Sequence, residues 1–175
     1  YSHSKDQTYT GELTHEEGLR VIDDLAAFGV PVLLFSGGEP LLRPDIMPLI
    51  AYARERGLRA VLSTNGTLIT PEAAARLKAL DLSYVGVSLD GLEEVNDHFR
   101  GKRGAFAQAL AGIRACRDAG IKVGLRFTIN RRNARDIGGI FDLLEAENIP
   151  RVCFYHLVYA GRGSKLIAED LSPEE

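Results

Sequence analysis

The sequence of 175 residues contains no tryptophan, one methionine and only two cysteines, Cys116 and Cys153. The two cysteines are far apart in the chain, so they form no local Cys-x-x-Cys metal-binding pair. Two cysteines are also too few for a small scaffold held together by disulfides. Because free cysteine is among the most buried residue types, we expect two reduced, buried thiols in a cytoplasmic protein.

The sequence also lacks a long apolar run, a signal peptide and an excess of basic residues. No apolar segment approaches the roughly 20 residues that span a bilayer. The 21 Lys and Arg residues and 24 Asp and Glu residues give a formal net charge of −3, unlike the basic footprint of a nucleic-acid-binding protein. We therefore expect neither a membrane nor a nucleic acid as partner. Hydrophobic residues make up 45% of the chain, which is typical of a core-forming domain and excludes a disordered tail.

What the sequence does contain is a regular alternation of apolar strand-like segments and amphipathic helical segments. The expected strands span 31–35, 58–62, 84–89, 123–129 and 151–158, and the expected helices begin near 15, 45, 71, 104 and 133. Such alternation indicates an α/β protein with parallel strands joined by right-handed crossovers. The available architectures are an open doubly wound sheet and a (β/α) barrel. No Gly-x-Gly-x-x-Gly follows a strand, which disfavours a dinucleotide-binding sheet. No linker interrupts the chain, so we expect one domain.

Several helix starts have capping signals. Thr14 and Glu17 form the pattern of a capping box, and Thr70 precedes a proline at the first helical position. Asp45 is expected to cap the second helix. The last helix of the alternating region is expected to open at Asn133 and to end near Glu147.

Polar residues accumulate at the carboxyl ends of successive strands. They occur in Ser36-Gly37-Gly38-Glu39-Pro40, in Ser63-Thr64-Asn65-Gly66 and in Ser88-Leu89-Asp90-Gly91. Each segment alone could be a simple turn. In α/β folds, however, ligands bind beyond the carboxyl ends of the strands, and several polar tips at that edge indicate a ligand site.

The fourth expected strand has one wholly polar face. Alternation with a period of two places Gly124, Arg126, Thr128 and Asn130 on that face. A packed barrel interior would instead carry branched apolar residues. This face is therefore expected to line the ligand site.

Other polar residues are expected to lie on the surface. The basic segments 100–103 and 131–132 are interpreted as solvated loop charges rather than a phosphate clamp. His3, His15 and His98 lie in polar surroundings, whereas His156 could face the pocket or the solvent.

The segment Phe35-Ser36-Gly37-Gly38-Glu39-Pro40 resembles the S-adenosylmethionine amine motif of the radical S-adenosylmethionine (radical SAM) superfamily. The segments 63–66 and 87–91 are similar, in order and spacing, to the motifs on the next two strands of that family. The polar strand with Arg126 and Asn130 and the final strand before Gly161-Arg162-Gly163 continue the resemblance, which covers roughly 14–164. It implies a partial (β/α)6 TIM-like barrel of parallel strands that lacks its first strand.

The resemblance also implies roles for individual residues. Two glycines permit close approach of a ligand, and Glu39 would accept the ammonium group of S-adenosylmethionine. Arg126, helped by Ser88, would bind the methionyl carboxylate. The implied cofactor-binding residues are Gly37, Gly38, Glu39, Pro40, Ser63, Asn65, Ser88, Asp90, Arg126, Thr128 and Asn130, of which Ser63, Thr128 and Asn130 would contact the ribose or adenine. No residue of the chain is assigned as catalytic.

The chain departs from the family at its defining motif, Cys-x-x-x-Cys-x-x-Cys, which binds a [4Fe–4S] cluster. Cys116 and Cys153 cannot replace these ligands. The segment 1–4 resembles the residues that follow the third cysteine, so the cluster ligands are expected just upstream of Tyr1. The segment 172–175 has the signals of a helix start. We therefore expect residues 1–175 to be a fragment of one radical SAM core domain, truncated at both ends and inactive on its own.

The segments 9–14 and 153–164 are most similar to enzymes of heme d1 biosynthesis and of the alternative heme pathway. This implies reductive cleavage of S-adenosylmethionine to a 5′-deoxyadenosyl radical, hydrogen abstraction from a siroheme-derived tetrapyrrole, and ferredoxin or flavodoxin as electron donor. The alternatives are a peptide- or cofactor-maturing radical SAM enzyme, a non-catalytic domain that binds S-adenosylmethionine without a cluster, and a phosphate-binding (β/α) barrel enzyme.

Overall fold

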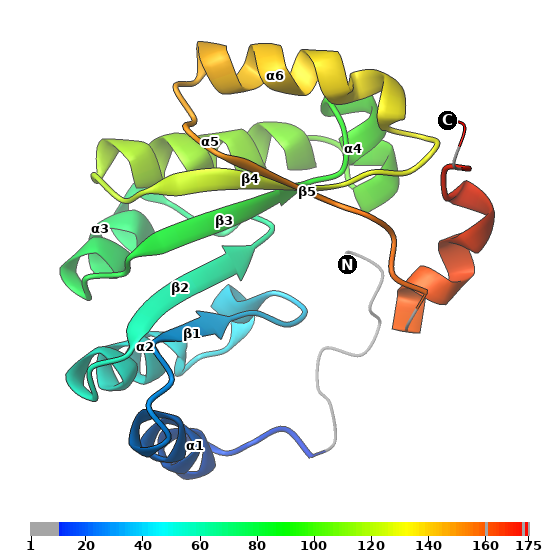
Figure 1. The fold of residues 1–175 in the computed structure, drawn as a ribbon. Coiled ribbons are helices and arrows are strands. Elements are labelled where there is room, and N and C mark those ends of the chain that lie inside the picture. Colours follow the sequence, from blue (N-terminus) through cyan, green and yellow to red (C-terminus); the bar gives the residue numbers. More distant parts are fainter. Residues whose placement is uncertain (1–10, 160, 173, 175) are drawn as a thin grey trace.

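The computed structural model describes residues 11–159, 161–172 and 174, and within them five parallel strands form one sheet in the order β1-β2-β3-β4-β5. The strands are β1 (Val32–Phe35), β2 (Arg59–Thr64), β3 (Tyr84–Leu89), β4 (Val123–Thr128) and β5 (Val152–Tyr155). The sheet is curved, and the helices lie along its convex outer side (Figure 1). The prediction of an α/β fold with a parallel, barrel-type sheet is confirmed.

Helices alternate with the strands as the sequence predicts, except that two helices rather than one separate β3 from β4, and the first of these two was not predicted. The helices are α1 (His15–Ala27), α2 (Ile46–Glu55), α3 (Pro71–Ala79), α4 (Glu93–Arg100), α5 (Ala105–Asp118) and α6 (Ile137–Ala146), with 3-10 segments η1 (Pro40–Leu42), η2 (Ala134–Asp136) and η3 (Gly161–Glu169). The predicted last helix thus begins as a 3-10 turn, and β5 is shorter than expected. The expected start of a further helix at 172–175 lies partly outside the described residues.

Two of the three predicted helix caps are confirmed. The Thr14 hydroxyl accepts a hydrogen bond from Glu17 N at 3.2 Å, and Glu17 Oε2 accepts one from Thr14 N at 2.8 Å, which completes the capping box. The Thr70 hydroxyl accepts a hydrogen bond from Ala73 N at 3.1 Å. Both caps satisfy amide groups that would otherwise lack an intrahelical partner.

The predicted cap at Asp45 is wrong. Asp45 precedes α2, but its side chain makes no capping hydrogen bond. Its carboxylate instead binds Arg43 Nε at 2.6 Å and His15 Nδ1 at 2.9 Å, because two cationic or donor side chains compete with the helix amides for the same oxygens. His15 is partly exposed, and this contact ties the start of α1 to the start of α2.

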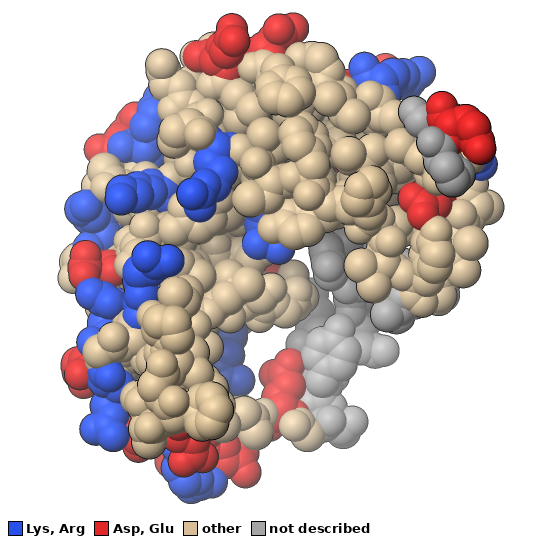
Figure 2. Space-filling view, viewed as in Figure 1, with Lys and Arg blue, Asp and Glu red and all other residues tan. Residues whose placement is uncertain are grey.

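The hydrophobic core lies between the sheet and its outer helices. Large side chains that are almost fully buried include Phe127 and Leu125 of β4, Leu62 of β2, and Ile50 of α2. The alternation predicted for β4 is confirmed, since its apolar side chains enter this core. The surface is hollowed beside the carboxyl ends of the strands (Figure 2). In the described part of the chain, no helix is both long enough and apolar enough to span a bilayer.

The two cysteines differ in burial. Cys116 lies in the core with no exposed surface, and burial raises the pKa of its thiol to about 11. Cys153 on β5 is only partly buried. Both thiols are free, so the expected burial holds fully for Cys116 alone.

Candidate functional site

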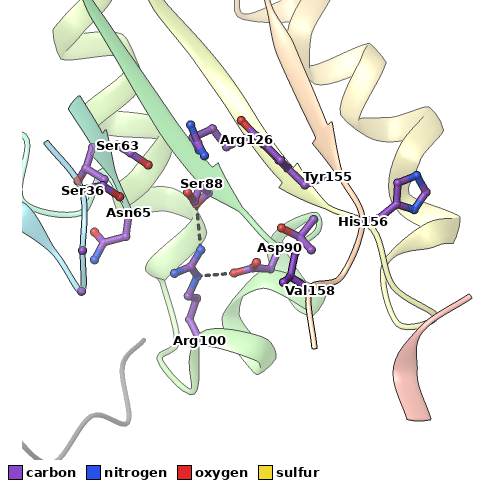
Figure 3. Close-up of a pocket in the computed structure, with 14 residues that line it drawn as sticks. Ser36, Ser63, Asn65, Ser88, Asp90, Arg100, Arg126, Tyr155, His156 and Val158 are labelled. Atoms are coloured by element: carbon purple, nitrogen blue, oxygen red, sulfur yellow. Dashed lines mark hydrogen bonds and ion pairs between the residues drawn. The ribbon is translucent and has the colours of Figure 1, made fainter. Parts of the chain in front are cut away.

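A cavity of about 310 Å³ lies where the carboxyl ends of the strands meet (Figure 3). All five strands or the loops that follow them contribute to its lining. The lining residues are Ser36, Gly37, Gly38, Ser63, Thr64, Asn65, Ser88, Asp90, Arg100, Arg126, Thr128, Tyr155, His156 and Val158. The cavity therefore lies at the edge of the sheet where the sequence predicts a ligand site, and polar groups make up most of its lining.

The two glycines after β1 form an open part of the cavity wall. Gly37 has a φ of +133°, a conformation that disfavours any side chain. A Cβ placed on Gly37 or Gly38 would meet no atom within 4 Å, so these glycines adjoin empty space rather than packed protein. A ligand can therefore approach the backbone of this turn closely.

Glu39 does not line the cavity. Its Oε1 accepts hydrogen bonds from the Thr64 hydroxyl at 2.7 Å and from Leu41 N at 3.2 Å, and its Oε2 accepts one from Asn65 N at 2.8 Å. The carboxylate therefore joins the loop after β1 to the end of β2. Pro40, which is buried and begins η1, also lies outside the lining.

The end of β2 is shaped by local side-chain hydrogen bonds. The Thr64 hydroxyl, besides donating to Glu39, accepts a hydrogen bond from Gly66 N at 3.0 Å. The Asn65 side-chain oxygen accepts from both the amide and the hydroxyl of Thr67, at 2.8 and 2.7 Å. Such Asx-type bonds fix the turn and place Ser63 and Asn65 along one wall of the cavity.

The loop after β3 contributes a buried ion pair. Arg100 Nε lies 2.5 Å from Asp90 Oδ2, and the two side chains are only 8% and 13% exposed. Arg100 also donates to Ser88 O at 3.2 Å (Figure 3). Burial raises the pKa of the Asp90 carboxyl group, and the charge of Arg100 opposes that shift. The prediction that Arg100 is a solvated loop charge is wrong, because α4 carries it into the cavity wall.

Arg126 and Ser88 are brought together, as the sequence predicts. They are partners in the parallel register of β3 and β4, so their side chains leave the same face of the sheet. The Arg126 guanidinium lies over the Tyr155 ring, with 4.7 Å between its Cζ and the ring centroid. Among the described residues, no carboxylate forms an ion pair with Arg126, in contrast to Arg100.

Thr128 lines the cavity, but Asn130 does not. Asn130 is buried, its Nδ2 donates to Thr128 O at 3.3 Å, and its Oδ1 accepts from Arg132 N at 3.0 Å. The fully buried Asn133 donates from Nδ2 to Asp90 O and Thr128 O at 3.0 and 2.9 Å. These amides therefore connect the ends of β3 and β4 beneath the site.

Sequence reasoning missed several lining residues. Ser36 and Thr64 stand within the recognised strand-end segments and could have been included on that ground. Tyr155 is the register partner of Thr128, but this pairing depends on a strand alignment that the sequence does not show. The His156 ring points away from Ser88, Asp90 and Arg126, although the residue borders the cavity (Figure 3).

The other residues predicted to lie on the surface are exposed where the structure describes them, but the two arginines of segment 131–132 also contact η3. His98, Lys102 and Arg103 are exposed, whereas His3 lies outside the described residues. Arg131 and Arg132 are exposed but bind η3, with Arg131 Nη1 donating to Ala168 O at 3.1 Å. Within residues 11–159, 161–172 and 174, no three His, Cys, Asp or Glu side chains are grouped as metal ligands would be.

The family model of the radical SAM superfamily matches residues 1–144. Among curated proteins, the chain is 65% identical over 175 residues to Fe-coproporphyrin III synthase of Methanosarcina barkeri, which covers 100% of this chain and 44% of that protein. It is 45% identical over 170 residues to pre-heme d1 synthase of Dinoroseobacter shibae, covering 97% of this chain and 42% of that protein. The chain thus spans less than half the length of these relatives.

A solved structure has the same fold at low sequence identity. Native anSMEcpe with bound AdoMet and Kp18Cys peptide superposes with a TM-score of 0.78 and 18% identity, covering 95% of this chain and 49% of that chain. The likeness confirms the barrel-type α/β architecture.

Proposed function

The chain belongs to the radical SAM superfamily, and on that premise we propose that it forms the S-adenosylmethionine-binding core of an enzyme that modifies a tetrapyrrole. The observation that carries the proposal is the cavity at the carboxyl ends of the strands. There the open glycine turn, Ser88 and Arg126, which forms no ion pair with any described residue, face one space.

The residues of this cavity fit the polar groups of S-adenosylmethionine. The Arg126 guanidinium, which has no ion-pair partner among the described residues, is suited to a carboxylate, with the Ser88 hydroxyl beside it. Gly37 and Gly38 leave room for the amino acid portion. Ser63, Asn65 and Thr128 offer polar groups to the ribose and adenine. Glu39 holds the glycine turn against β2 and can influence the ammonium site through that turn.

The chemistry that S-adenosylmethionine supplies in this family is one-electron cleavage of its sulfonium carbon–sulfur bond, with an electron from a reduced [4Fe–4S] cluster, to give methionine and a 5′-deoxyadenosyl radical that takes a hydrogen atom from the substrate. The residues of this chain bind and orient the cofactor. Their second task is to keep water and competing groups from the reacting carbon. The buried Asp90–Arg100 pair contributes to this by closing one side of the cavity with two opposite charges.

The cysteines of the chain do not fit the cluster. Three thiolates are needed, and the sequence has two cysteines. Cys116 is enclosed in the core, with a thiol pKa of about 11, and Cys153 lies apart from it on β5. We therefore assign no cluster ligand to residues 1–175.

The relatives support a tetrapyrrole as substrate. The named proteins at 65% and 45% identity are an Fe-coproporphyrin III synthase and a pre-heme d1 synthase. One name contains a porphyrin and the other a heme, which are both tetrapyrroles, and we propose the same substrate class here. Two free cysteines are compatible with a reducing cytoplasmic setting, where ferredoxin or flavodoxin would serve as electron donor.

Anaerobic turnover of the full-length protein tests the cofactor reaction. After reconstitution with iron and sulfide, dithionite and S-adenosylmethionine should yield 5′-deoxyadenosine above the level of a cluster-free control. Arg126→Ala should raise the KM for S-adenosylmethionine about tenfold or more, since one charge-assisted contact is removed. Arg103→Ala, an exposed arginine outside the cavity, is the matched control. Absence of 5′-deoxyadenosine in the wild-type reaction would overturn the proposed function.

The substrate class is tested separately by adding siroheme-derived tetrapyrroles to the same reaction. A substrate should increase 5′-deoxyadenosine formation and change in mass by the loss of carboxylate-derived groups. Modification of a peptide instead, with every tetrapyrrole unchanged, would support the peptide-maturing alternative and contradict the tetrapyrrole assignment.

A further inference from the structure

The Arg126 side chain is held between two neighbouring strands by contacts that are not ion pairs. On the β5 side, the Tyr155 ring lies 4.7 Å, measured from its centroid, from the guanidinium carbon. Figure 3 shows both side chains projecting from the ends of β4 and β5 toward the same part of the cavity. Attraction between a guanidinium and an aromatic face keeps the cation over the face of the ring.

On the β3 side, the stem of Arg126 occupies space that only a glycine leaves open. A Cβ on Gly86 would lie 2.9 Å from Arg126 Cδ and 3.2 Å from its Cγ. Gly86 is buried and is not among the glycines with a positive φ, so its backbone conformation would accept alanine. The need for glycine at this position is therefore a need for space, and Arg126 fills that space.

These contacts matter because arginine has many rotatable bonds. A guanidinium without an ion-pair partner can adopt several orientations. A ligand that binds only one of them gains less free energy, because binding removes the conformational entropy of the side chain. A side chain that is already held loses less freedom on binding. The Gly86 gap and the Tyr155 ring together supply that restriction for Arg126.

We propose that Tyr155 is a positioning residue that acts through Arg126, and that the Tyr155 ring and the Gly86 gap increase the affinity of the site for ligands that carry a carboxylate. The inference rests on the proposed binding of the S-adenosylmethionine carboxylate by Arg126. Tyr155 does not itself bind the carboxylate, so its effect depends on the presence of Arg126.

The first test measures S-adenosylmethionine affinity and KM for the full-length reconstituted protein and its variants. Tyr155→Leu should weaken S-adenosylmethionine binding about three- to tenfold, the range expected for loss of a partly exposed cation–π contact, with kcat changed less than KM. Tyr155→Phe keeps the ring and should stay within about twofold of the wild type. The matched control is Phe154→Leu, on the same strand but facing the core, where Phe154 packs against Phe127. It should leave the affinity unchanged.

A double-mutant cycle separates positioning from a general structural role. In the Arg126→Gln background, Tyr155→Leu should cause no further loss of affinity. A second probe is decarboxylated S-adenosylmethionine, which should bind wild-type and Tyr155→Leu proteins equally. Equal weakening of both ligands, or an additive loss in the double variant, would contradict the proposal.

Gly86→Ala tests the same inference without changing Tyr155, and it therefore serves as the second variant if Tyr155→Leu impairs folding. The added methyl should displace Arg126 and weaken S-adenosylmethionine binding severalfold. Gly138→Ala, on α6 where a Cβ meets no atom within 4 Å, is the control. Wild-type protein that fails to bind S-adenosylmethionine would overturn the proposed function together with this inference. Wild-type binding that neither Tyr155→Leu nor Gly86→Ala changes would overturn the inference alone.

Discussion

Arg100 Nε lies 2.5 Å from Asp90 Oδ2 inside the cavity wall, and both side chains are almost fully buried. Arg100 comes from the end of α4 and Asp90 from the loop after β3, so the pair fastens that helix to the site. Charges that are removed from water are stabilised by each other and by the Ser88 carbonyl group, to which Arg100 also donates.

Removal of Arg100 should destabilise the fold as well as the site. Arg100→Met leaves a buried carboxylate without its cation, a change that costs about 3–5 kcal/mol in comparable pairs. Urea unfolding of the full-length protein, followed by circular dichroism, measures this loss. Arg103→Met, which is exposed in the same basic segment, should change the free energy of unfolding by less than about 0.5 kcal/mol. Equal effects of the two substitutions would show that the pair is not buried in solution.

Gly112 on α5 marks a close approach between that helix and the loop after β2. A Cβ on Gly112 would lie 2.3 Å from Gly66 O, an atom of the backbone that cannot easily move. Gly112→Ala should therefore destabilise the protein by about 1–3 kcal/mol, although alanine is the better helix former. Gly138→Ala on α6 meets no neighbour and should stabilise it by about 0.5–1 kcal/mol. In thermal unfolding we expect Gly112→Ala to lower the melting temperature and Gly138→Ala to raise it. A stabilising Gly112→Ala would contradict the close approach.

Glu147 contributes a pH dependence to stability. Hydrogen bonding from Arg114, helped by the charges of Arg114 and Arg117, lowers the pKa of the largely buried Glu147 carboxyl group below its usual value. A lowered folded-state pKa means that the stabilisation is present above the unfolded-state pKa, near 4.5, and is lost as the pH falls through the folded-state pKa. Arg114→Met should therefore reduce stability at pH 7 and flatten its decline below about pH 4.5.

The measurement is the free energy of unfolding from pH 3 to pH 7 for the wild type and the variant. The two curves should approach each other at low pH, where Glu147 is protonated in both proteins. Arg103→Met, at an exposed arginine after α4, should give a curve nearly parallel to that of the wild type. A constant offset between Arg114→Met and the wild type across the range would exclude this linkage.

The strands and the shared edge of the site could be predicted because they depend on local patterns. The apolar runs predict buried parallel strands, and the polar tips at Ser63, Ser88 and Arg126 fall at one edge because parallel strands end together. Alternation places Arg126 on the polar face of its strand, whereas the pairing of Arg126 with Ser88 comes from the resemblance to the radical SAM family. The register of β3 and β4 then makes these two residues direct neighbours.

The roles of Arg100, Asp45 and Glu39 could not be predicted in this way. The helix that carries Arg100, α4, spans only eight residues, Glu93–Arg100, and contains two apolar residues, Val95 and Phe99. This is too short a pattern to predict a helix from the sequence. Asp45 binds His15, which lies 30 positions earlier, and such a long-range partner overrides the capping pattern. Glu39 likewise meets Thr64 and Asn65 only because the sheet brings β1 beside β2.

Glu39→Gln distinguishes a carboxylate that braces the loop from one that only binds an ammonium group. Three donors converge on the two Glu39 oxygens, namely the Thr64 hydroxyl and the amides of Leu41 and Asn65. Glutamine offers one oxygen, so its NH2 group would face at least one of these donors. We expect the free energy of unfolding to fall by about 1–3 kcal/mol in the absence of any ligand, together with weaker S-adenosylmethionine binding. Glu16→Gln on the exposed side of α1 is the control for loss of one negative charge. Because the bracing bonds exist without ligand, unchanged ligand-free stability with weakened binding would assign Glu39 to the ammonium group alone and exclude the brace.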